Sequence, residues 1–109
     1  MPQTPEGKVK ARVRAKLKEI GSYWFTPATG GYGKSGVPDI VACINGKFVG
    51  IECKAGDNKP TILQEKNLAE IRANGGIALV IHENNLDELD YYFKSLSQLL
   101  KDKKAREGQ

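Results

Sequence analysis

Three charged side chains in one short segment have the types and spacing to do chemistry together. Asp39 opens the predicted strand 39–44, while Glu52 and Lys54 close the predicted strand 47–54. Strands more often carry apolar or β-branched residues at such positions. Two adjacent carboxylates can bind a divalent cation, and an ammonium group beside them can position or activate a water. This combination suits the hydrolysis of a phosphate ester.

The turn between the two strands decides whether these charges meet. Asn45-Gly46 is a strong signal for a two-residue hairpin turn. Pairing the strands outward from that turn places Asp39 directly opposite Glu52, with Cβ atoms about 4.5–5.5 Å apart. Lys54 lies two residues further on and therefore projects from the same face. The register predicts two carboxylates and an ammonium at one end of one sheet face.

Two facing carboxylates repel each other, and the sequence leaves three remedies open. They share a proton, Lys54 neutralises one of them, or a divalent cation binds both. Because carboxylate oxygens are hard ligands, the cation would be Mg²⁺, with Mn²⁺ as a substitute. The alternative to a metal or catalytic site is an ordinary edge hairpin whose charged side chains form cross-strand salt bridges.

Two further polar residues are expected to point toward the same region. Glu6 lies three residues before Val9, on the inward stripe of the predicted first helix. It is a candidate third acidic ligand or water contact, although a helix-dipole complement explains it as well. Gln64 shares a helix face with Leu68 and Ile71 and therefore points inward. A capping role in the Thr-x-x-Gln pattern explains Gln64 equally.

The elements that must position these residues follow from hydrophobic periodicity and from turn and cap signals. Three strands follow the first helix, and a helical crossover leads to a fourth. We therefore predict one α/β domain spanning 1–109, with a mixed four-stranded sheet flanked by helices in the order α-β-β-β-α-β-α. In chain order we expect a helix from the Thr4 cap to Gly21, strands 22–26, 39–44 and 47–54, a helix 61–72, a strand 77–81, a helix 86–100 and a frayed tail 101–109.

The positive charge is concentrated in the first helix. The first 20 residues carry six Lys or Arg and two Glu side chains, which accounts for the whole net charge of +4. Such an excess suits contact with a polyanion, although a solvated helix face explains it too. On this helix, Lys8 and Arg12 are the candidates for contacts to a DNA backbone.

The glycine-rich loop 27–38 offers a second set of possible DNA contacts. Tyr32, Lys34 and Ser35 could contact phosphates or a flipped base. Ordinary loop chemistry is the simpler explanation.

The remaining composition excludes several classes of protein. Cys43 and Cys53 are too few for a disulfide scaffold, lack zinc-site spacing and should lie on opposite sheet faces, so we expect reduced thiols. No apolar run approaches the ~20 residues of a membrane span. The N-terminus lacks the apolar core of a signal peptide, so we expect an intracellular protein that is not secreted and has no membrane partner.

Pro38-Asp39, followed by Glu52-Cys53-Lys54 at the end of the next strand, resembles the PD-(D/E)XK nuclease signature. More closely, "GKSGVPDIVACINGKFVGIECK" followed by "TILQEKNLAEIRANGGIALVI" is similar to the VRR-NUC domain, a nuclease module of viruses, bacteria and eukaryotic repair proteins. The similarity runs from about Glu6 to about Ile81. It implies a restriction-endonuclease-like core.

The resemblance also implies an activity and a set of site residues. The activity would be metal-dependent cleavage of DNA phosphodiester bonds. Carried over by position, Asp39 and Glu52 bind the metal with the Cys53 carbonyl, Lys54 is the catalytic lysine, Glu6 is the acidic residue of the first helix, and Gln64 is the polar residue after the lysine.

Stand-alone domains of this size are typical of phage proteins and resemble Holliday junction resolvases in acting as homodimers. The resulting hypothesis is a Mg²⁺-dependent, structure-selective endonuclease that cuts branched DNA in repair or recombination. A different class remains open, namely a non-catalytic or partner-dependent DNA-binding module that retains the nuclease fold. A third is a small basic structural protein with a fortuitous hairpin.

Overall fold

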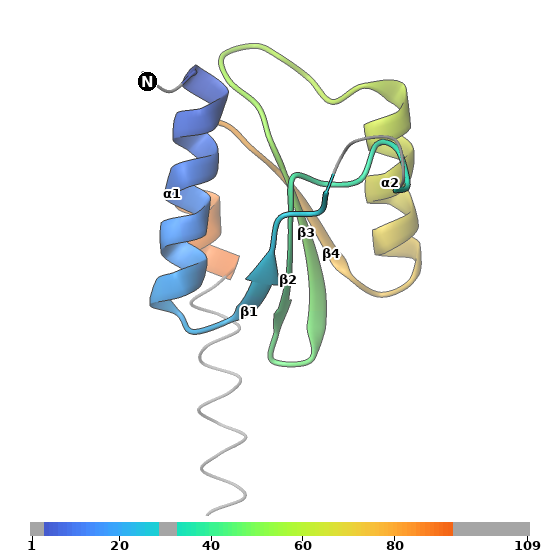
Figure 1. Ribbon diagram of the computed structural model, residues 1–109, viewed down its shortest axis with the longest axis horizontal. Coiled ribbons are helices and arrows are strands. Elements are labelled where there is room, and N and C mark those ends of the chain that lie inside the picture. Colours follow the sequence, from blue (N-terminus) through green and yellow to red (C-terminus); the bar gives the residue numbers. More distant parts are fainter. Residues whose placement is uncertain (1–3, 29–32, 93–109) are drawn as a thin grey trace, which may run out of the picture.

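The computed structural model describes residues 4–28 and 33–92. Residues 87–92 begin a helix whose predicted continuation to 100 lies outside the described residues, as do Tyr32 and the predicted tail 101–109. The predicted order α-β-β-β-α-β-α is confirmed (Figure 1). The other elements are α1 (Pro5–Glu19), β1 (Tyr23–Phe25), β2 (Ile40–Ile44), β3 (Lys47–Cys53), α2 (Ile62–Ala73) and β4 (Ile77–Ile81).

Both complete helices begin at the predicted caps. Thr4 Oγ1 accepts a hydrogen bond from the Gly7 N–H at 2.9 Å, and Pro5 occupies the first turn of α1, where no N–H donor is needed. At α2, Thr61 Oγ1 accepts from the Gln64 N–H at 3.2 Å, and Gln64 Oε1 accepts from the Thr61 N–H at 2.8 Å. This capping box fixes the start of α2 next to the end of β3.

The four strands form one sheet in the order β1-β2-β3-β4. The β1–β2 and β2–β3 pairs are antiparallel, and the β3–β4 pair is parallel, as a helical crossover requires. The predicted hairpin register is confirmed, with Ile40 opposite Ile51. Asn45 and Gly46 both have positive φ, at 51° and 81°, which is the geometry of the tightest hairpin turns.

At the end of the hairpin that carries the charges, each strand is one residue shorter than predicted. β2 begins at Ile40 and not at Asp39, and β3 ends at Cys53 and not at Lys54. The reason is that the Asp39 side chain accepts the Cys53 N–H at 2.9 Å, so this donor bonds a carboxylate instead of a main-chain carbonyl. The backbone pairing of β2 with β3 therefore ends next to the charged residues, at the hydrogen bond from the Cys53 N–H to the Asp39 side chain.

The sheet lies between two helices, one on each face (Figure 1). The α1 stripe is fully buried and packs with Ile40, Ile51 and Ile81 on one face; its members are Val9, Val13 and Leu17. On the other face α2 approaches closely at Gly50, where an added Cβ would lie 2.7 Å from Ile71 Cδ1. The mixed sheet between helices is consistent with the predicted restriction-endonuclease-like fold.

The two cysteines are free, with Cys43 exposed and Cys53 buried, and the register puts them on opposite faces as predicted. Among the described residues, no helix is long and apolar enough to cross a membrane.

Candidate active site

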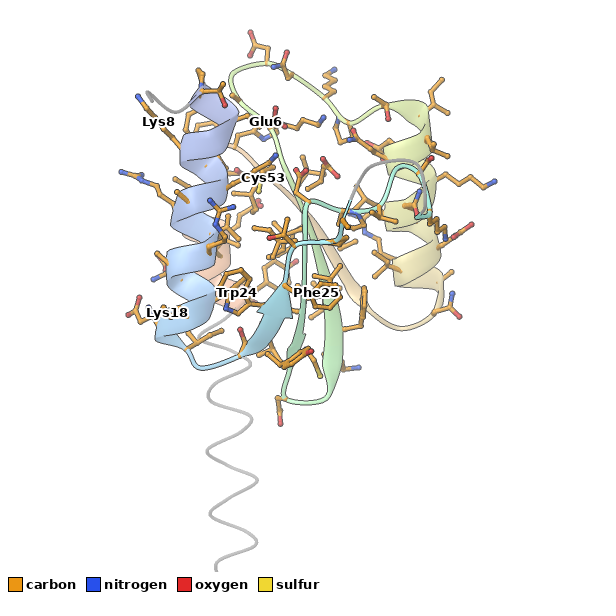
Figure 2. The ribbon with its side chains drawn as sticks, viewed as in Figure 1. Glu6, Lys8, Lys18, Trp24, Phe25 and Cys53 are labelled. Carbon is orange, nitrogen blue, oxygen red and sulfur yellow. The ribbon has the colours of Figure 1, made fainter. Side chains whose placement is uncertain are left out.

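Three carboxylates from three elements gather at one end of the sheet. Glu6 comes from the first turn of α1, Asp39 from the residue before β2, and Glu52 from β3, one residue before its end. One oxygen of each lies within 4.8 Å of the others. Figure 2 shows Glu6 and Cys53 at this end, near the N-terminus of α1. Because Glu6 is half-buried and turned toward the sheet, its inward orientation is confirmed.

Asp39 has two differently used oxygens. Its Oδ2 accepts the Cys53 N–H at 2.9 Å, which fixes the carboxylate plane against β3. Its Oδ1 lies 3.5 Å from the Lys10 ammonium of α1. The backbone therefore orients the carboxylate through Oδ2, while Oδ1 faces the Lys10 ammonium.

Glu52 is nearly fully buried, with 1% of its surface exposed. Its Oε1 accepts from Gln64 Nε2 at 3.1 Å and lies 3.9 Å from the Lys54 ammonium. Its Oε2 is buried and has no hydrogen-bond partner in the part of the chain that the structure describes. A buried, unpaired carboxylate oxygen is costly unless something binds it.

Burial and the adjacent Asp39 carboxylate, in that order, raise the pKa of Glu52 from 4.5 to about 8, although Lys54 acts in the opposite direction. The pKa of the Cys53 thiol rises to about 12, chiefly by burial and then through Asp39. Lys54 thus only partly relieves the repulsion between the carboxylates. In the metal-free protein, a proton on Glu52 relieves the rest below about pH 8.

The residues present fit a hard divalent cation. The side-chain donors are the carboxylates of Glu6, Asp39 and Glu52, and the Cys53 carbonyl lies in the adjacent backbone. Glu52 also has an oxygen, Oε2, without a partner among the described residues. Oxygen donors of this kind suit Mg²⁺ or Mn²⁺. A cation would displace the proton from Glu52 and satisfy the orphan oxygen at once.

The structure reconciles the two sequence-based explanations of Gln64. Its amide oxygen closes the capping box with Thr61, and its amide nitrogen donates to Glu52. One side chain therefore starts α2 and orients a carboxylate of the candidate site.

The residues predicted to contact DNA do not all lie near the carboxylates. Lys8 and Arg12 are exposed on α1, and Figure 2 shows Lys8 on its outer side. Lys34 instead pairs with Glu70 of α2 at 2.9 Å. Ser35 is also held at α2, because its carbonyl accepts from Asn67 Nδ2 at 3.2 Å. The loop thus packs on α2, away from α1.

Sequence reasoning missed Lys10. It is one of the six basic residues among the first 20, and no contact was predicted for it, yet its ammonium lies 3.5 Å from Asp39 Oδ1. A signal was available, because Lys10 follows Glu6 by four residues and so shares its helix face.

Comparison with known proteins gives two findings. The family described as "Archaeal holliday junction resolvase (hjc)" matches residues 13–98. The chain is also 32% identical over 87 residues to "Putative nuclease p44" of Acyrthosiphon pisum secondary endosymbiont phage 1, an alignment covering 77% of this chain and 89% of that protein. The family match contains Asp39, Glu52, Lys54 and Gln64, while Glu6 precedes it. The closer assignment to the VRR-NUC domain stays a prediction.

Proposed function

The chain belongs to the archaeal Holliday junction resolvase family, and from this premise we propose that it is an endonuclease that cuts branched DNA at a divalent-metal site. The observation that carries the proposal is the unpartnered Oε2 of buried Glu52 beside two other carboxylates. Below about pH 8 a proton shared with Asp39 relieves this oxygen, and a divalent cation would replace that proton and bind the neighbouring carboxylates as well. The relative named as a nuclease supports the same class of activity.

Asp39 and Glu52 would hold the metal, with the Cys53 carbonyl and Glu6 as further donors. Mg²⁺, for which Mn²⁺ should substitute, supplies positive charge to a phosphate oxygen and lowers the pKa of a water when bound. The chain's own contribution is to hold the donors in place. The Cys53 N–H orients Asp39, and the Gln64 amide orients Glu52.

Lys54 is the proposed catalytic lysine. Its side chain is only 13% exposed, and its ammonium lies 3.9 Å from Glu52 Oε1. A sheltered ammonium at this place would hold the attacking water and stabilise the negative charge that develops on the phosphorane.

The basic outer side of α1 is the proposed surface for the DNA backbone. Lys8 and Arg12 are exposed there, on the helix that also delivers Glu6 to the carboxylates. Contacts of this kind are independent of sequence and weaken with salt. Lys34, Ser35 and Tyr32 remain weaker candidates, since a phosphate would have to displace Glu70 from Lys34.

We further propose that the active form is a homodimer, because symmetric cutting of a junction needs two sites related by a twofold axis. On the sheet face that packs against α2, strands β1 and β3 carry an exposed aromatic patch, defined as Tyr23, Phe25 and Phe48, which are 74%, 50% and 50% exposed. At about 200 Å² for each aromatic side chain, it offers roughly 350 Å² of apolar area. That is a substantial part of the about 800 Å² per partner in a standard interface.

A second copy is the occupant that this patch fits. Tyr23 and Phe48 both lie opposite Cys43, four residues along β2 from Asp39, so pairing through this end of the patch would leave both carboxylate clusters open to DNA. Figure 2 shows Phe25 toward the turn end of the sheet relative to Glu6 and Cys53. A groove of about 380 Å³ walled by Val41, Phe48 and Ile71 adjoins the patch and could receive a partner's side chain.

Cleavage of labelled four-way junction, flap and linear duplex, each with Mg²⁺, Mn²⁺ or EDTA, tests the proposal. Junction-selective cutting that needs a metal supports it. Cutting of every substrate would keep the nuclease and remove the branched-DNA preference. Salt-sensitive junction binding without cutting under any metal would instead favour a DNA-binding module that needs a partner.

A further inference from the structure

Among the basic side chains of α1, Lys10 has a distinct environment. Lys16 pairs with Asp90 and Glu19 at the other end of the helix, whereas Lys10 pairs with Asp39 of the carboxylate cluster. The Lys10 side chain is 33% exposed, so its ammonium sits at the boundary between the cluster and solvent. Its contact is with Oδ1, the Asp39 oxygen that the Cys53 N–H leaves available.

Each of the two central carboxylates therefore has its own lysine in the metal-free protein. Lys54 lies beside Glu52, and Lys10 lies beside Asp39. The two lysines differ in freedom, because the Lys54 side chain is 13% exposed and enclosed while Lys10 reaches the cluster along the helix surface. A divalent cation bound to Asp39 would repel an ammonium so close to the same oxygen, and Lys10 is the one that can move away.

On the strength of the proposed function, we propose that Lys10 is a positioning residue that couples metal binding to DNA binding. In the DNA-free protein its ammonium competes with the cation for Asp39 Oδ1. When DNA lies along α1 and a divalent cation binds Asp39, the ammonium leaves the carboxylate for a backbone phosphate near the cut. Metal therefore binds more tightly in the presence of DNA, and DNA more tightly in the presence of metal.

The charges around the cluster suit this exchange. Glu6 precedes Lys10 by one helical turn and adds a further negative charge to the cluster that attracts the ammonium. Arg14 follows Lys10 by four residues on the same side of α1 and would help to bring a phosphate backbone within its reach. A lysine suits the task because its flexible stem carries a point charge that can change partners.

The test is Mn²⁺ binding to the full chain without DNA, measured calorimetrically for the wild type, Lys10→Met, Lys10→Arg and Lys18→Met. Lys18 is the matched control because it removes the same charge from the opposite end of the helix (Figure 2). We expect Lys10→Met to bind Mn²⁺ about 5-fold or more tightly, within the usual range of coupling between ligands. Lys10→Arg and Lys18→Met should stay near the wild type. Equal or weaker Mn²⁺ binding by Lys10→Met would overturn the inference.

A second readout uses binding of an uncut four-way junction in EDTA and in Ca²⁺, chosen as a cation expected to bind the carboxylates with little turnover. In EDTA, Lys10 stays with Asp39, so Lys10→Met should bind the junction almost as well as the wild type. In Ca²⁺ the ammonium is released to the DNA, so the variant should lose several-fold in affinity. An equal loss under both conditions would mean that Lys10 is an ordinary phosphate contact, which contradicts the exchange.

These measurements separate the inference from the proposed function. If Mn²⁺ binds the wild type and Lys10→Met alike, the metal site stands and the role of Lys10 fails. If Mn²⁺ binds none of the variants, the metal centre and the exchange fail together.

Discussion

Gln64 connects the second helix to Glu52 through the two ends of one amide. Its Oε1 accepts the Thr61 N–H at 2.8 Å, and its Nε2 donates to Glu52 Oε1 at 3.1 Å. Folding of α2 and orientation of a buried carboxylate thus depend on the same side chain. The two tasks can be separated by substitution, because Glu serves in a capping box as well as Gln but cannot donate to a carboxylate when ionised.

Gln64→Glu should therefore keep the start of α2 and lose activity. We expect the free energy of unfolding to fall by about 1–3 kcal/mol, because the cap survives but buried Glu52 loses its donor. Single-turnover cleavage should fall about 10-fold or more, because Glu52 loses its donor and gains a repelling neighbour. Thr61→Ala is the matched control, and it should lower stability by about 1 kcal/mol with little effect on cleavage. Full activity in Gln64→Glu would show that the Gln64–Glu52 contact is dispensable.

The raised pKa of Glu52 makes the stability of the metal-free protein depend on pH. This pKa is about 8 in the folded protein, against 4.5 for the ordinary group. Between these values the folded state holds a proton that the unfolded state has lost, so the free energy of unfolding falls as pH rises. The contribution is fully present below about pH 4.5 and is lost as pH passes about 8, by at most about 1.4 kcal/mol per pH unit.

Urea unfolding at pH 5, 6, 7 and 8 in EDTA measures this effect against Glu52→Gln, in which the titrating group is absent. The wild type should lose stability relative to the variant with each step up in pH. Adding Mg²⁺ at pH 8 should restore the wild type and leave Glu52→Gln nearly unchanged. Parallel curves for the two proteins would show that Glu52 is already ionised at pH 5.

Gly50 tests how closely α2 must approach the sheet. An added Cβ would lie 2.7 Å from Ile71 Cδ1 and 2.9 Å from Pro38 Cγ. Gly50→Ala should lower the free energy of unfolding by about 1–3 kcal/mol through overpacking. Adding Ile71→Val, which removes one of the clashing atoms, should recover part of the loss. If the double variant were less stable than the sum of its single changes, the contact between Gly50 and Ile71 would not be the cause.

The aromatic patch predicts where two copies meet. Tyr23→Lys combined with Phe25→Lys places two charges on that surface and should convert a dimer into a monomer that no longer makes paired cuts. Tyr91→Lys is the control, because Tyr91 is 72% exposed but lies on the helix after β4. Light scattering after gel filtration distinguishes the outcomes. A dimer that survives the double substitution would place the interface elsewhere.

Local sequence signals were enough to predict the order of the helices and strands and the register of the hairpin. Asn45-Gly46 can adopt positive φ at both residues, so it fixed the pairing of β2 with β3 and brought Asp39 near Glu52. The Thr61 and Gln64 pattern likewise located the start of α2. The predicted start of the strand at Asp39 was wrong by one residue. The Cys53 N–H donates to the Asp39 side chain, and strand propensity does not predict such a bond.

Long-range contacts were harder to predict. The four-residue spacing from Glu6 to Lys10 indicated a shared helix face, but the contact of Lys10 with Asp39 depends on how α1 packs against the hairpin. Lys34 was equally ambiguous, since its partner Glu70 lies 36 residues away in sequence. The raised pKa of Glu52 could not be predicted from the sequence either, because it depends chiefly on how deeply the carboxylate is buried.

Single-turnover cleavage of a four-way junction by the wild type, Lys54→Met and Lys47→Met tests the central claim most directly. Lys47 is exposed at the turn end of the same hairpin, so its variant removes an equal charge away from the carboxylates. With Mg²⁺, the wild type and Lys47→Met should cut, and Lys54→Met should be slower by about 10²–10⁴-fold with junction binding preserved. EDTA should abolish cutting in all three. Cleavage by Lys54→Met at the wild-type rate, or cutting in EDTA, would contradict the assignment of this end of the sheet as the active site.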